Sequence, residues 1–368
     1  MGNWMCSVHS DFSEMLLLKK FLSGHVDLNC SDQLEKDELV ISQKCRNGQE
    51  LELQKLRWNE VYTYFEKYVI GVWNNNYDYY YLKYAQKDCQ QSGYDTLVVG
   101  SSYARFGYDE KMSNGRAKNL SLPSQDLYYA SKIADQILDS NNAIKNIVIG
   151  MGYYYFNSDL SRTENVGELS RISTVYEPLF GDVHNALILP ETVGIRKSSF
   201  WDIESILDFF SETIYRAIST EYFSAIHRRE QQRTVMWPDA TKGWSELSEK
   251  EREEAGRRRV ELHNKGVSHK ETYAENIEIL NELVDQCNKR GVRVTCCVFP
   301  ASREYMSGMD TQIKEEFWKA LENIRGEIHV IDLNECDCFE IKDFNDMDHL
   351  SESGAHKATE IINSVIFG

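Results

Sequence analysis

The order of segments from Asp95 onward most constrains what this chain can fold into. Short apolar runs alternate there with longer segments in which apolar residues recur at three- and four-residue steps, the period of a helix face. The predicted strands are Thr96–Val99, Lys118–Leu120, Asn146–Ile149, Val292–Phe299 and Ile328–Leu333, and the predicted helices include Gln125–Leu138, Thr272–Arg290 and Ser351–Ile366. Strands that alternate with helices pair in parallel and are covered on both faces. We therefore predict an α/β three-layer sandwich with a mostly parallel, flavodoxin-like sheet of about five strands.

Two stretches depart from this alternation and set the domain organisation. Residues 1–93 are predicted to be a helical N-terminal extension packed on the core, because their aromatic-rich part is typical of an accessory helix layer; carbohydrate stacking is the alternative. Residues 94–368 form the α/β domain, with a helical insertion at about 154–269. The insertion contains SELSEKEREEAGRRRVE, which has the spacing of a helix capping box and places its arginines after its acidic residues. We interpret it as a solvated helix, with an arginine-rich anion site as the alternative.

Composition disfavours several classes of partner. Lys and Arg number 41 against 58 Asp and Glu, a net charge of −17, which opposes nonspecific attraction to nucleic acid or anionic lipid. No stretch approaches the roughly 20 apolar residues that span a bilayer, and the N-terminal apolar run is too short for a signal peptide. We predict no membrane span, no nucleic-acid partner and a cytoplasmic location. The nine cysteines lack CxxC spacing and are expected to be reduced and packed as small apolar residues, with no metal site and no cofactor.

The first strand of the α/β region ends in an unusual way. Gly100 is followed by two adjacent hydroxyls, Ser101 and Ser102. One interpretation is a turn, since Gly-Ser-Ser supplies local hydrogen bonds and a permissive backbone. The other is a nucleophile at the carboxyl edge of the sheet, where open α/β sheets bind ligands. A base elsewhere in the chain would decide between them.

A candidate base follows the last predicted strand. Asp346 precedes His349 by three residues, immediately before a helix that Ser351 is expected to cap. At that spacing an Asp can hold one imidazole nitrogen while the other faces a nucleophile. Because the carboxyl ends of parallel strands share one edge, we predict a catalytic triad of Ser102, His349 and Asp346, with the serine and histidine within hydrogen-bond reach.

Three segments resemble sequence blocks of the SGNH/GDSL family of esterases, lipases and acyltransferases. Gly100–Ser102 resembles the first block, whose serine is the nucleophile, and Asp346–Leu350, with Gly354 beyond, resembles the last. Asn119–Asp126 is similar to the second block, in which a small residue, here Ser124, donates its backbone N–H to the oxyanion. The resemblance covers about residue 94 to the end, outside the insertion. It implies a serine esterase or O-acyltransferase, of acetyl groups, that acts on a carbohydrate or acylated small molecule, as do members associated with bacterial surface polysaccharides.

The third block departs from the family pattern. Its strand end has Gly152 where the family has an Asn whose side chain completes the oxyanion hole. Losing such a donor costs roughly 10²–10³ in rate. Tyr153 and Tyr154 are the first candidates to replace it, with Asn157 and Arg105 also near in sequence. Arg105 is in addition a candidate to hold an anionic part of the substrate, or is an ordinary surface arginine.

Two other classes of function stay open. A non-catalytic binding or assembly module in polysaccharide biosynthesis is favoured by the missing Asn. A nucleotide or phosphate binder on a flavodoxin-like sheet is ranked last, because GSSYARFG lacks the glycine spacing of a phosphate cradle and the chain has no GxxxxGK[ST]. If His349 is the base of an esterase, we expect the rate to rise with pH through a limb near the reference histidine pKa of about 6.5. The acyl group, the acceptor and the oligomeric state stay open.

Overall fold

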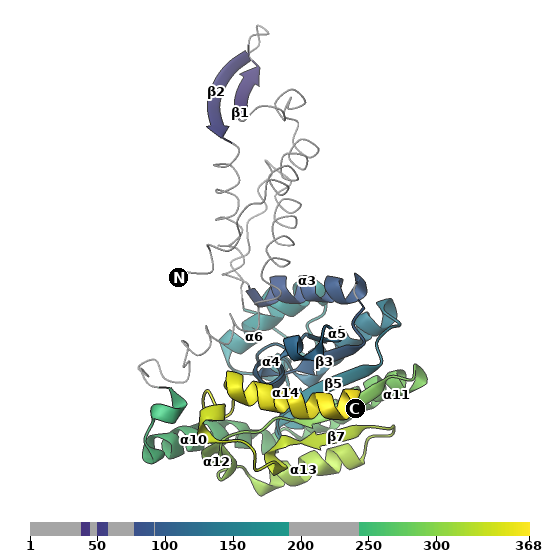
Figure 1. Ribbon diagram of the computed structural model, residues 1–368, viewed down its shortest axis with the longest axis vertical. Helices are drawn as coiled ribbons and strands as arrows, with labels where there is room; N and C mark the ends of the chain where they lie inside the picture. Colours follow the sequence, from purple (N-terminus) through teal and green to yellow (C-terminus); the bar gives the residue numbers. More distant parts are fainter. Residues whose placement is uncertain (1–37, 45–49, 58–76, 92, 191–242) are drawn as a thin grey trace. The chain divides into compact units, whose positions relative to one another are not determined.

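The computed structural model describes residues 38–44, 50–57, 77–91, 93–190 and 243–368 (Figure 1). The chain divides into two units, Met1–Tyr80 with Val193–Ser219, and Tyr81–Thr192 with Thr220–Gly368. Within the first unit, β1 (Glu38–Lys44) and β2 (Glu50–Arg57) form an antiparallel pair. The helical prediction for residues 1–93 is therefore wrong over this hairpin. It is correct for α3 (Tyr77–Gln91), and its other residues lie outside the described part of the chain.

The second unit is built on a five-stranded sheet in which every pairing is parallel. Its strands are β3 (Thr96–Gly100), β4 (Ala117–Asn119), β5 (Asn146–Met151), β6 (Arg293–Val298) and β7 (His329–Asp332), in the order β4-β3-β5-β6-β7. Counted from β3, this is the 2-1-3-4-5 order of flavodoxin-like sheets. The predicted fold class is confirmed, and each predicted strand is present with ends shifted by one or two residues.

Helices flank this sheet in two layers (Figure 1). The short helix α4 (Ser102–Gly107) packs on α14 (Glu352–Phe367), and α5 (Leu127–Ser140) packs on α11 (Lys270–Lys289). The crossover between β6 and β7 contains α12 (Arg303–Met306) and α13 (Thr311–Glu322). The described elements of the insertion are helical and include α6 (Val166–Arg171), α7 (Glu177–Phe180) and α10 (Glu249–Asn264).

Side-chain caps fix where several of these helices begin. Asp126 accepts the N–H of Tyr129 at the start of α5, and Ser351 accepts that of Gly354 at the start of α14. The predicted capping box of α10 is present, because Ser248 Oγ accepts the N–H of Glu251 and the Glu251 carboxylate accepts the N–H of Ser248.

The carboxyl ends of β3 and β5 approach each other closely. Gly100 has a φ of +130°, and a Cβ there would lie 2.3 Å from the carbonyl oxygen of Gly150, so a side chain fits neither the backbone conformation nor the space. These two strands meet where the strand order reverses, which is the point at which open α/β sheets bind ligands. The chain that leaves Gly100 therefore enters α4 beside the ligand crevice.

The cysteines differ in part from expectation. Cys336 and Cys338 form a disulfide, so the prediction of reduced thiols is wrong for this pair. Cys89, Cys287, Cys296 and Cys297 are free and buried, as expected. In the described part of the chain, no helix is both long enough and apolar enough to cross a membrane.

Candidate active site

The two adjacent hydroxyls at the end of β3 have different environments. Ser101 is the N-cap of α4, where its Oγ accepts the N–H of Tyr103 at 3.4 Å. Ser102 begins the helix, is 8% exposed, and lines a cavity. Both serines line the cavity, but Ser101 also caps the helix, whereas Oγ of Ser102 has no role in that cap.

His349 reaches Ser102 from the loop before α14. Its Nε2 lies 2.8 Å from Oγ of Ser102, and its Nδ1 lies 2.9 Å from Oδ2 of Asp346. Oδ1 of Asp346 accepts the backbone N–H groups of Asp348 and His349 at 2.9 and 2.8 Å. The Asp-x-x-His spacing thus forms a turn that fixes the carboxylate against the imidazole. The contacts expected among the three triad residues are present.

A second carboxylate also faces His349. Oδ1 of Asp348 lies 3.5 Å from Nδ1 of His349, and Asp348 is fully buried. Burial opposes the imidazolium, but Asp346 and Asp348 outweigh it and raise the pKa of His349 to about 9. Burial also opposes the charge on Asp346, yet the histidine and its hydrogen bond lower the pKa of Asp346 to about 2. The reference pKa of about 6.5 therefore underestimates the basicity of His349.

Asp348 joins the histidine loop to the insertion. Its Oδ2 accepts a hydrogen bond from Nε of Arg259 at 2.8 Å and another from the hydroxyl of Tyr103 at 3.2 Å. Arg259 lies on α10, the helix that we predicted to be solvated. That interpretation holds for Arg257 and Arg258, whose side chains are 61% and 55% exposed, and fails for Arg259, whose side chain is 20% exposed.

Ser124 lines the same cavity as Ser102. Its φ of +55° lies in the left-handed region, which residues with side chains seldom adopt. The loop is held there by Gln125, whose Oε1 accepts the N–H of Gly100 at 2.9 Å and whose Nε2 donates to the carbonyl of Leu120 at 3.3 Å. The N–H groups of Ser102 and Ser124 have no acceptor in the described part of the chain, so both are available to an oxyanion.

Aromatic rings crowd the space beside Gly152, the residue at which the resemblance implies an Asn. A Cβ at Gly152 would lie 3.1 Å from the ring of Tyr154 and 3.2 Å from that of Tyr103, so an Asn fits only if a ring moves. Tyr153 points elsewhere, because its hydroxyl donates to Oδ2 of Asp332 at 2.5 Å and the residue does not line the cavity. The prediction that Tyr153 replaces the donor is wrong. Tyr154 lines the cavity and stays a candidate.

Arg105 and Asn157 have other partners. Arg105 is 2% exposed, lies with its guanidinium 4.8 Å from the ring centroid of Tyr81, and does not line the cavity. Its predicted role in substrate binding is wrong, because α4 is buried along its whole length and its second turn has no access to the cavity. Asn157 lines the cavity, but its Nδ2 donates to Glu316 at 3.3 Å.

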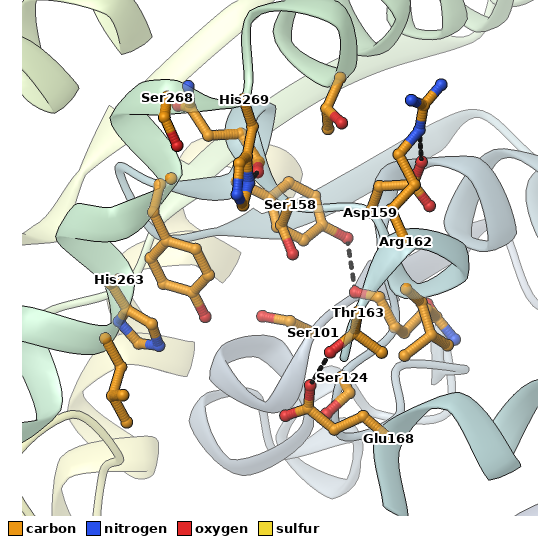
Figure 2. Close-up of a pocket in the computed structure, with 18 of the residues that line it drawn as sticks. Ser101, Ser124, Ser158, Asp159, Arg162, Thr163, Glu168, His263, Ser268 and His269 are labelled. Carbon is orange, nitrogen blue, oxygen red and sulfur yellow. Dashed lines mark hydrogen bonds and ion pairs between the residues drawn. The ribbon is translucent and has the colours of Figure 1, made fainter. Parts of the chain in front are cut away.

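The cavity beside Ser102 has a volume of about 590 Å³ (Figure 2). Figure 2 shows His263, Ser268 and His269 on one side, and Asp159, Arg162, Thr163 and Glu168 on the other. Most of this wall belongs to the insertion, whereas Ser101, Ser102 and Ser124 come from the sheet edge. The wall is rich in hydroxyl, carboxylate and imidazole groups.

Sequence reasoning assigned no role to Asp348 or His263, and it raised Arg259 only within an alternative, the arginine-rich anion site. Asp348 directly precedes His349 in the Asp346–Leu350 block, so the sequence indicated that the two residues are close. Arg259 had the arginine run as its only signal, and its pairing with Asp348, 89 residues away, had none. His263 is four residues beyond Arg259, one helical turn, and stacks on Tyr154 at 3.8 Å.

Two groups of described residues have ligand atoms close enough to hold a metal ion. One is Asp346, Asp348 and His349, and the other is Asp126, Asp159 and His184. The first group is occupied by the hydrogen bonds described above. In the second, His184 contacts Glu275 at 3.2 Å through Nε2 and Asp159 at 3.5 Å through Nδ1. Both groups are therefore explained by interactions within the chain.

No family model and no curated protein matches this chain. The SGNH/GDSL resemblance therefore stays a prediction. What the site can do is inferred from the geometry of its own residues.

Proposed function

We propose that this protein is a serine-dependent acyl-ester hydrolase or O-acyltransferase that transfers acetyl groups and acts on a carbohydrate. The observation that supports this most is the chain of contacts from Asp346 through His349 to Ser102, at 2.9 and 2.8 Å, beside a polar cavity. The resemblance to the SGNH/GDSL blocks agrees with it. Modification of a bacterial surface polysaccharide and a cytoplasmic location belong to the proposal by analogy alone.

The first half of the proposed reaction forms an acyl-serine. Neutral His349 takes the proton of Ser102 while Oγ attacks the ester carbonyl. Asp346 holds Nδ1 and stabilises the imidazolium, and the N–H groups of Ser102 and Ser124 bind the oxyanion. His349 then gives its proton to the oxygen of the leaving alcohol, and the acyl group stays on Ser102.

The second half resolves the acyl-serine. His349 takes a proton from water or from a sugar hydroxyl while that oxygen attacks the acyl carbonyl. The bond between the acyl group and Oγ of Ser102 then breaks, and His349 returns the proton to Oγ. Attack by water gives hydrolysis, and attack by a sugar gives transfer. The polar wall suits a sugar, because hydroxyl and carboxylate groups can each pair with sugar hydroxyls. Such groups are supplied by Ser158, Asp159, Thr163, Glu168 and Ser268.

A catalytically weak or inactive binding module is the second candidate. The rings of Tyr103 and Tyr154 crowd a side chain at Gly152, where the resemblance implies the third oxyanion donor. The pKa of about 9 also keeps most of His349 protonated at neutral pH. A module of this kind would bind the same carbohydrate in the cavity without catalysing any reaction of it.

Labelling with a fluorophosphonate probe separates the two candidates. At pH 9, where about half of His349 is neutral, we expect the wild-type protein to be labelled and Ser102→Ala to be unlabelled. Ser101→Ala is the matched control and should be labelled, because Ser101 acts as a helix cap. Peptide mass spectrometry locates the label. An unlabelled wild-type protein at this pH would favour the binding module.

A further inference from the structure

Within the part of the chain that the structure describes, the cavity is lined by three cationic side chains, Arg162, Lys270 and Arg259, and each of them forms an ion pair with a carboxylate. Arg162 donates to Asp159 at 3.0 Å and to Glu271 at 3.2 Å. Lys270 forms an ion pair with Glu316. The positive charges of these two residues are therefore compensated at the cavity wall.

Arg259 is different because only one of its nitrogens is engaged. Its Nε donates to the buried carboxylate of Asp348 at 2.8 Å. Its two Nη groups have no hydrogen-bond partner in the described part of the chain and are not sealed from the cavity that the residue lines. The anchor at Nε fixes the plane of the guanidinium, which leaves a rigid pair of donors open.

The surroundings of Arg259 keep its guanidinium protonated. Burial opposes a cation here, but Asp348 and the nearby tyrosines outweigh it and raise the pKa of Arg259 further. Its neighbour His263 adds no charge, because burial and Arg259 hold the pKa of His263 well below its usual value. Among the described residues of this wall, Arg259 is thus the guanidinium whose two terminal nitrogens are both open.

We propose that Arg259 is an anion-binding subsite, which receives a carboxylate or phosphate group carried by the carbohydrate substrate. A guanidinium with a free edge binds such groups through two parallel hydrogen bonds, a geometry that lysine does not offer. Asp348 contacts Arg259 through one oxygen and faces His349 with the other, so a bound anion lies close to the catalytic histidine. The inference rests on the proposed function only for the identity of the reacting group; anion binding itself needs no catalysis.

Direct binding tests this proposal without relying on turnover. Three probes, glucose, glucuronate and glucose 6-phosphate, are titrated into the full chain carrying Ser102→Ala, and binding is followed by ligand-detected NMR. We expect at least one anionic sugar to bind roughly ten- to a hundredfold more tightly than glucose, as charge-assisted hydrogen bonds allow. Preference for glucuronate identifies a carboxylate subsite, and preference for glucose 6-phosphate a phosphate subsite.

Three variants show whether Arg259 is responsible. Arg259→Lys keeps the charge beside Asp348 and should lose most of the preference, because the paired donors are gone. Arg259→Gln alone leaves Asp348 buried and uncompensated, so the double change Arg259→Gln with Asp348→Asn removes both charges together and should abolish the preference. Arg257→Gln is the matched control on the same helix, 61% exposed, and should keep it. Equal binding of all three sugars, or a preference that survives the double change, would overturn the proposal. Failure of fluorophosphonate labelling would instead count against the enzyme and leave these binding results interpretable.

Discussion

Replacing His349 with alanine should reduce kcat for an activated acetyl ester by roughly 10⁴–10⁶, with little change in KM. The loss is large because His349 is the group that contacts Ser102, at 2.8 Å, and the serine hydroxyl is too weakly acidic to ionise alone. KM should change little, because the cavity wall and the two N–H donors stay in place. Steady-state kinetics of 4-nitrophenyl acetate hydrolysis at pH 9 measures both constants.

His356→Ala is the control for this experiment. His356 lies on α14, pairs with Asp109 at 3.2 Å and is 44% exposed, so its loss should leave the rate close to that of the wild type. Equal hydrolysis by His349→Ala and wild type would contradict the assignment of the base.

Replacing Asp348 with asparagine should move the pH dependence of kcat/KM toward lower pH. In the wild type the rate should fall about tenfold for each pH unit below about 9, because only neutral His349 can take the proton. Asp348 raises this pKa, so removing its charge lowers the pKa and increases the neutral fraction at pH 7. Asparagine still offers an oxygen to Tyr103 and Arg259, which limits structural damage. The variant should therefore be faster than the wild type at pH 7.

Removing the positive charge of Arg259 tests the sign of this effect on the pKa of His349. Arg259 lowers the pKa of His349, so adding Arg259→Gln to Asp348→Asn should move the limb back toward higher pH, without leaving a buried carboxylate uncompensated. A pH profile of Asp348→Asn that superimposes on the wild-type profile would show that Asp348 does not act on the histidine.

The sheet could be predicted because its strands are buried apolar runs with clear ends. β3 and β5 are buried at every residue, so neither sequence shows the polar face of an amphipathic helix. The β1–β2 hairpin was harder to predict from the sequence. Its second strand, ELELQKLR, alternates polar and apolar residues, but Glu, Leu, Gln, Lys and Arg all favour helices, and pairing with β1 decides the outcome.

The contacts among Asp346, His349 and Ser102 could be predicted because one is local and the other follows from the topology of the sheet. Asp346 and His349 belong to one turn, and parallel strands bring that turn to the edge that presents Ser102. The direction in which an individual side chain points was harder to predict from the sequence. Tyr153 and Tyr154 are neighbours, yet one hydroxyl binds Asp332 and the other residue lines the cavity.

Arg259 shows why long-range partners were missed. Each residue of a helix turns by about 100°, so one step separates the exposed Arg258 from the inward-facing Arg259. Periodicity marks a buried face only where apolar residues line it, and this helix buries few of them. The charge that Arg259 meets, Asp348, becomes visible only in the folded chain.

Detection of an acyl group on Ser102 is the most direct test of the proposed acyl-serine. Wild-type protein is mixed with 4-nitrophenyl acetate at pH 9, quenched in acid, digested and analysed by peptide mass spectrometry, with Ser102→Ala treated in parallel. We predict one acetyl group on Ser102 in the wild type, none at the corresponding position in the variant, and loss of ester hydrolysis in the variant. Hydrolysis at the same rate in both proteins, with no acetyl group on Ser102, would contradict a serine acyl-enzyme.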